Sequence, residues 1–93
     1  MANTKSAKKR IDNNKRNRLR NKYYKTSVRT LIKIFFKNLE VYMISKNLED
    51  KNKVRETLKL IYSMMDKGTK KNIFHKNKTA RTKSRLAAYL KKA

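Results

Sequence analysis

The stretch that decides the fold is Y-K-T-S-V-R-T-L-I-K-I-F-F-K-N-L-E-V-Y, residues 24–42. Its large apolar residues recur at spacings of four, three, four, four and three, which places them on one side of an α-helix. These residues are Tyr24, Val28, Leu31, Phe35, Leu39 and Tyr42, with Ile32, Phe36 and Met43 widening the stripe. The cations of the same stretch, Arg29, Lys33 and Lys37, lie on the opposite side. We therefore predict a first helix that begins near residues 3–6, where side-chain caps are available, and ends near Ser45.

A second helix is predicted over residues 50–67. Since the chain has no proline and one glycine, few positions interrupt helices. Val54, Leu58, Ile61 and Met65 form a stripe that matches the first, with Thr57 and Met64 beside it. We interpret Phe35, Phe36, Met64 and Met65 as core residues. The competing N-caps are Asn47, Asp50 and Asn52, and Gly68 is predicted as a left-handed C-terminal cap.

A third helix is predicted to begin between residues 72 and 77 and to end near Lys91. Its expected packing side consists of Ala80, Ser84, Ala87 and Leu90, and the opposite side is a basic ridge of Lys78, Arg81, Arg85 and Lys92. The sequence thus predicts an all-α fold, a three-helix bundle with a long, protruding N-terminal helix. We expect one domain, residues 1–93, with a basic arm at about 1–22 and a helical bundle at about 23–93.

The charge of the chain predicts a polyanionic partner. The net charge is +22, from 28 Lys and Arg against six Asp and Glu, and no acidic residue follows Asp66. Such an excess exceeds what solubility requires. The cations of residues 8–22 point all round the helix and leave no apolar face for packing. We therefore expect residues 1 to about 20 to fray in the free protein and to become helical on binding.

Catalytic and metal chemistry is disfavoured. The chain has no cysteine, and a lone histidine cannot assemble an imidazole cluster. The acidic residues show neither paired-carboxylate nor metal-loop spacing, and no glycine loop is present to hold a phosphate. We expect no enzyme activity, no cofactor and no small-molecule substrate. His75 is interpreted as a polar contact to RNA or as a turn-stabilising hydrogen bond, rather than as a catalytic base.

Two adjacent tyrosines are candidates for stacking on RNA bases. Tyr24 belongs to the core stripe and is expected to pack, whereas Tyr23 remains open between base stacking and a plain surface role.

Three stretches resemble the bacterial and plastid-type S20 family of small ribosomal subunit proteins: M-A-N-T-K-S-A-K-K-R (1–10), V-R-T-L-I-K (28–33) and I-F-H-K-N-K-T-A-R-T-K-S-R-L (73–86). The resemblance implies a structural protein that binds small-subunit rRNA directly, bridging the five-prime domain and the long helix near the three-prime end. By position it implies RNA contacts at Lys5, Ser6, Lys8, Lys9, Arg10, His75, Lys76, Asn77, Lys78, Arg81, Lys83, Ser84 and Arg85. The rest of the basic arm and the first helix add Lys15, Arg16, Arg18, Arg20, Lys22 and Arg29 as predicted contacts.

The resemblance also implies an oligomeric state, a set of neighbours and a cellular compartment. We expect a monomer within the ribosome that touches other small-subunit proteins only peripherally and has no membrane partner. Because the family motif begins at Met1, no transit peptide is expected. The stretch at residues 16–25 resembles plastid-encoded algal versions, so we prefer the plastid stroma to the bacterial cytoplasm. Residues 43–53 depart from the family pattern, which leaves the first turn open.

Two rival functions are consistent with a basic helical chain. A nucleoid-type protein would compact duplex DNA, but the sequence has no groove-inserting proline arm. A membrane-active cationic helix would need an exposed apolar face opposite its charges, whereas the two best stripes here are expected to cover each other.

Overall fold

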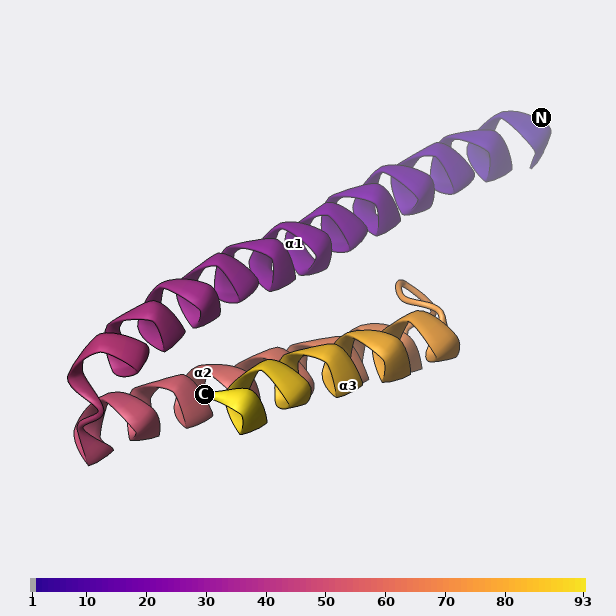
Figure 1. Cartoon of the computed structure of the whole chain (residues 1–93). Helices are drawn as coiled ribbons and strands as arrows, with labels where there is room; N and C mark the ends of the chain where they lie inside the picture. Colours follow the sequence, from indigo (N-terminus) through magenta and orange to yellow (C-terminus); the bar gives the residue numbers. More distant parts are fainter. Residues whose placement is uncertain (1) are drawn as a thin grey trace.

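The chain forms three helices. The computed structural model describes the backbone of residues 2–93 and the side chains of residues 4–93. The helices are α1 (Ala2–Ser45), α2 (Leu48–Lys70) and α3 (Lys76–Lys92). Figure 1 shows α2 running back along α1, α3 lying beside α2, and the N-terminal part of α1 extending past the α2–α3 turn. The molecule measures 67 × 21 × 13 Å. The predicted all-α fold with a long, protruding first helix is confirmed.

The hydrophobic core lies mainly between α1 and α2. The predicted stripes on both helices are confirmed, and Phe35, Val54 and Ile61 are completely buried. The remaining buried apolar residues are Val28, Leu39, Met65, Phe74 and Leu86. Tyr24 packs against this core, as predicted. Because each fully buried apolar side chain contributes about 1.5–3 kcal/mol, this core is the main source of stability.

A polar contact between α1 and α2 fixes their alignment. Asn38 Nδ2 donates to Thr57 Oγ1 over 3.1 Å, and the Thr57 hydroxyl donates to the Lys53 carbonyl over 2.9 Å. The buried hydroxyl therefore has both a donor and an acceptor partner, as buried polar groups require. Any slip of α1 along α2 would break this arrangement.

Two residues predicted to belong to the core lie at its edge. Phe36 is 39 % exposed and Met43 is 55 % exposed. The Phe36 ring contacts the ring of Tyr89 on α3 edge-on, with 5.2 Å between their centroids. The core interpretation of these two residues was wrong because the stripe on α1 faces α2, and α3 covers only one border of it.

The packing side of α3 also differs from the prediction. Ala80, Ser84 and Ala87 are exposed, whereas Thr79 and Leu86 are buried and Leu90 is half-buried. The hydroxyls of Thr79 and Thr69 lie 2.7 Å apart and link α3 to α2. The predicted face was wrong because the large Leu86 decides the packing side: burying one leucine removes more apolar area from water than burying any one of the small residues.

The α1–α2 turn begins α2 earlier than predicted. Lys46 has a positive φ of 57°, and Asn47 is the N-cap residue, although its side chain makes no cap hydrogen bond. Ser45 takes part instead: its hydroxyl donates to the Asp50 carboxylate and accepts from the Asn47 backbone N–H. α1 likewise begins at Ala2, ahead of the predicted caps, and a capping role for Asn3 lies outside the described side chains.

Gly68 is not a left-handed cap. It lies inside α2, which continues to Lys70, and the positive φ of the α2–α3 turn is at Asn72, 61°. The prediction was wrong because a tertiary contact, not the backbone conformation, requires glycine at this position. The ring of Phe74 occupies the space where a side chain of residue 68 would lie.

Candidate nucleic-acid interface

The α2–α3 turn places His75 at the start of α3. His75 has extended backbone angles and is the N-cap, and its Nδ1 accepts from the Asn77 backbone N–H over 3.1 Å. The predicted turn-stabilising hydrogen bond is therefore confirmed. No acidic residue lies in the first turn of α3, so nothing on this helix neutralises the positive end of its dipole.

A hollow of about 520 Å³ begins at this turn and extends along α3. We call it the α3 basic groove; its lining residues are His75, Asn77, Lys78, Arg81, Thr82 and Arg85. The predicted basic ridge is thus exposed, and it borders a concave surface. Arg81 and Arg85 can each fork onto two phosphate oxygens, whereas Lys78 acts as a point charge.

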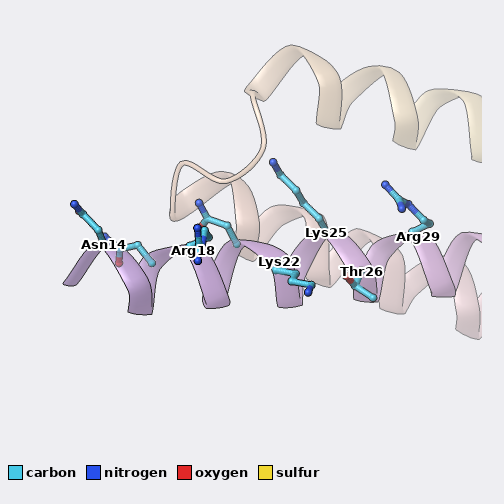
Figure 2. Close-up of a pocket in the computed structure, with 8 residues that line it drawn as sticks. Asn14, Arg18, Lys22, Lys25, Thr26 and Arg29 are labelled. Carbon is cyan, nitrogen blue, oxygen red and sulfur yellow. The ribbon is translucent and has the colours of Figure 1, made fainter. Parts of the chain in front are cut away.

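A second hollow, of about 600 Å³, runs along the side of α1. Arg18, Lys25 and Arg29 line it at spacings of seven and four, and we call these three residues the α1 basic flank. Figure 2 shows Lys25 and Arg29 extending from the same side of the helix, while Lys22 points away from them in this view. The neutral lining residues are Asn14, Asn17, Asn21 and Thr26.

A groove of about 590 Å³ between α1 and α3 connects these two hollows. Its apolar lining consists of Val28, Ile32, Met65 and Phe74, and its charged lining of Lys25, Arg29, Lys33 and Lys78. It shares Lys25 and Arg29 with the hollow on α1, and it shares Lys78 and Thr82 with the α3 basic groove. The three therefore form one continuous surface, which we call the composite basic surface.

The remaining predicted contacts lie on the projecting part of α1. All side chains of residues 4–20 are exposed. They include Lys5, Ser6, Lys8, Lys9, Arg10, Lys15, Arg16, Arg18 and Arg20, and Lys22 is exposed as well. Asp12 is the only acid in this segment, so the arm is available to an anion from every side.

Comparison with known proteins shows the family to which the chain belongs. The chain matches the family model of ribosomal protein S20 over residues 2–91. It belongs to the S20 family. It is 62 % identical over 91 residues to the small ribosomal subunit protein bS20c of Phaeodactylum tricornutum, covering 98 % of both chains. It is 59 % identical to bS20c of Trieres chinensis with the same coverage, and 48 % identical to bS20 of Prochlorococcus marinus strain AS9601, covering 94 % of that protein.

This S20 chain is therefore a component of the small ribosomal subunit. Its relatives are of plastid and bacterial type, which agrees with the predicted setting and with the preference for a plastid. Within residues 2–93, none of its helices combines the length and the apolar character needed to cross a membrane.

Lys83 of the S20 chain makes contacts within the protein. Its ammonium pairs with Asp66 at 2.5 Å and lies 5.1 Å from the centroid of the Tyr62 ring. The Tyr62 hydroxyl donates to the Lys83 carbonyl over 3.1 Å. Lys83 thus joins α3 to α2 and does not line the α3 basic groove. Lys76 and Ser84 are exposed but are likewise outside the groove lining.

Several residues of the composite basic surface were absent from the sequence prediction. Lys25 is shared by two hollows, yet only its spacing of four from Arg29 signals its place. Thr82 lines the α3 basic groove and carries no charge to reveal it.

The stacking candidate Tyr23 lies outside these hollows. Its side chain is 62 % exposed beside the packed Tyr24, so it remains accessible to a base.

Proposed function

We propose that this chain binds small-subunit rRNA directly through the composite basic surface and the projecting part of α1. The observation that carries the proposal is the continuity of the three hollows through Lys25, Arg29 and Lys78. Cations from two distant parts of the sequence meet on one surface, and none of the described residues that line it is acidic. Such a surface suits the dense negative charge of an RNA backbone.

The mechanism is structural. The α1–α2 core sets the position of the arm relative to α3, so that two basic elements face two RNA segments which would otherwise repel each other. Most contacts go to phosphates and 2′-hydroxyls, and specificity arises from RNA shape. The two segments are those that the family resemblance implies: the five-prime domain and the long helix near the three-prime end.

The same proposal includes a monomer in a plastid or bacterial ribosome, with only peripheral contacts to other subunit proteins. The chain acts as one domain without catalysis, cofactor or small-molecule substrate. Support comes from relatives named as small ribosomal subunit proteins and from hollows whose charged lining residues, among those that the structure describes, are all cations.

A competition assay tests the partner. A labelled rRNA fragment that contains both segments is bound at about 150 mM salt and challenged with unlabelled fragment, duplex DNA or an unrelated structured RNA. We expect only the cognate fragment to compete well. Equal competition by all three would overturn shape recognition and favour the nucleoid-type function. Flotation with anionic vesicles, performed in parallel, is expected to show no lipid binding.

A pair of double variants tests the surface. Arg81→Glu with Arg85→Glu reverses two charges on the α3 basic groove, and Arg55→Glu with Lys59→Glu makes the same change at the same spacing on the exposed side of α2. We expect the first pair to abolish specific binding and the second to weaken it only slightly, with thermal unfolding nearly unchanged in both. Equal losses of binding would show that net charge alone matters.

A further inference from the structure

The stripe of α1 continues past the α2–α3 turn, but as asparagines. Counting back from the packed Tyr24, Asn21, Asn17 and Asn14 follow at spacings of three, four and three, the same rhythm as the apolar stripe. Asn14 and Asn17 lie in the fully exposed part of the helix, and Figure 1 shows that no other helix runs beside that part. Three amides thus occupy the register that faces α2 and α3 further along α1.

Helix stability does not explain these amides. Asparagine is a poorer helix former than alanine because its side chain competes for backbone hydrogen bonds. The Asn21 Oδ1 atom is sheltered from solvent and has no hydrogen-bond partner among the described residues. All three amides line the hollow on α1 beside Arg18 and Lys25. Their position indicates hydrogen bonding to something outside the chain.

Cations border the amides on both sides. The α1 basic flank provides Arg18 and Lys25 on one side. On the other side Arg20 lies next to the amides, and Arg16, one turn earlier, lies further round towards the back of the helix; both are exposed. Helical periodicity keeps these cations apart, with the amides between them. The pattern along residues 14–25 is therefore a neutral, hydrogen-bonding stripe with positive charge on each side.

The minor groove of A-form RNA has the complementary pattern. It is wide and shallow, displays 2′-hydroxyls and base edges at its centre, and has phosphates of one strand on each side. An amide donates and accepts hydrogen bonds at the same time, as a 2′-hydroxyl does. The minor groove of B-form DNA, about 6 Å wide, is too narrow for a helix about 10–12 Å across and has no 2′-hydroxyl.

We propose that Asn14, Asn17 and Asn21 dock α1 along the minor groove of an A-form RNA duplex, with the amides bonding 2′-hydroxyls and base edges. Arg18 and Lys25 then meet the phosphates of one strand, and Arg20 those of the other. This inference rests on the proposed rRNA binding and adds the form of RNA and the groove that the projecting helix recognises.

The triple variant Asn14→Ala, Asn17→Ala, Asn21→Ala separates contact from helix order. Alanine raises helix propensity, so if the order of the arm were the limiting factor, the variant would bind the rRNA fragment more tightly. Docking predicts a loss of at least about tenfold, because several hydrogen bonds disappear together. The salt dependence should not change, whereas Arg18→Ala should lower its slope by about one. The matched control is Asn52→Ala, an exposed amide on α2.

The RNA provides the reciprocal test. Replacing the 2′-hydroxyls by hydrogens in the duplex segment that the arm protects from cleavage should weaken binding of the natural chain. The triple variant should lose little further affinity on the same substituted fragment, because the same hydrogen bonds are already absent. Losses that simply add would overturn the docking.

The two proposals fail in distinguishable ways. If the natural chain prefers cognate RNA over duplex DNA but neither the triple variant nor the 2′-deoxy fragment changes affinity, the amide stripe is overturned and rRNA binding stands. If the natural chain shows no preference, both proposals are overturned. The three amides lie outside the core, so the unfolding temperature of the triple variant should be unchanged. Asn17→Ala alone, at an exposed site, repeats the binding test with the least structural change.

Discussion

The ring of Phe74 lies directly against the backbone of Gly68. A Cβ atom added to Gly68 would overlap with Cδ2 and Cε2 of the Phe74 ring. The Gly68 carbonyl accepts from the backbone N–H of Ile73 over 2.8 Å. The chain thus folds back on the last turn of α2, and this contact sets where His75 begins α3.

Gly68→Ala should destabilise the protein although it removes a glycine from a helix. Alanine favours the helix by about 1 kcal/mol. Displacing the buried Phe74 ring is expected to cost more, about 1–3 kcal/mol, which lowers the unfolding temperature. Ser63→Ala, at an exposed site on α2, is the control. The double variant Gly68→Ala, Phe74→Leu should recover part of the loss; a Gly68→Ala chain more stable than the natural one would show that the ring moves freely.

The adjacent residues Phe35 and Phe36 should respond very differently to truncation. Phe35 is completely buried, whereas Phe36 is 39 % exposed and contacts two rings edge-on, that of its neighbour Phe35 and that of Tyr89, its aromatic partner on another helix. Phe35→Ala is expected to cost about 3–5 kcal/mol of unfolding free energy. Phe36→Ala should cost about 0.5–1.5 kcal/mol, the usual range for an edge-on aromatic pair. Urea titration measures both, and similar losses would contradict the helix orientation.

The cap at His75 should be replaceable by a carboxylate. His75→Ala removes the acceptor for the Asn77 N–H and should cost about 1 kcal/mol. His75→Asp keeps an acceptor at the N-cap and adds a favourable charge at the positive end of the helix, so its stability should equal or exceed that of the natural chain. Lys76→Ala, at the first residue of α3, serves as the control in thermal unfolding. If His75→Ala leaves the unfolding temperature unchanged, the cap contributes nothing to stability.

The sequence predicts the helices and their main stripes because large apolar residues recur over about five turns of α1. It does not predict the packing side of α3, where Leu86 is one large residue among small ones and the choice depends on α2. Gly68 was mispredicted for a similar reason. Its position in the sequence is typical of a C-terminal cap, but its role depends on the contact with Phe74, which is distant information that a local pattern does not contain. The basic segments were predicted from the sequence. That Arg29 and Lys78 line the same groove depends on how α1 and α3 pack, which the sequence pattern does not give.

Lys83 and Arg85 should have separate roles although only one residue lies between them. Lys83→Ala removes the pair with Asp66; both groups are partly exposed, so the loss of stability should stay below about 1 kcal/mol, and RNA affinity should hardly change. Arg85→Ala should leave stability unchanged while weakening RNA binding and lowering its salt slope by about one. Filter binding at several salt concentrations distinguishes them. Equal losses of affinity would place Lys83 in the interface.

The projecting part of α1 should order on RNA. Residues 4–20 have no buried side chain and carry eight cations, and the first of these, Lys5, lies near the positive end of the helix dipole, where it is unfavourable. The helix seen in the structure is therefore expected to fray in the free protein at low salt and to be stable when RNA phosphates neutralise these charges. Backbone chemical shifts measure this directly, with residues 28–42 of the same helix as the internal control. The control segment should be helical in both states because its stripe is buried, whereas residues 4–20 should shift towards helical values only when the rRNA fragment is added. Full helicity of both segments without RNA would show that the arm is preformed and that binding bears no ordering cost.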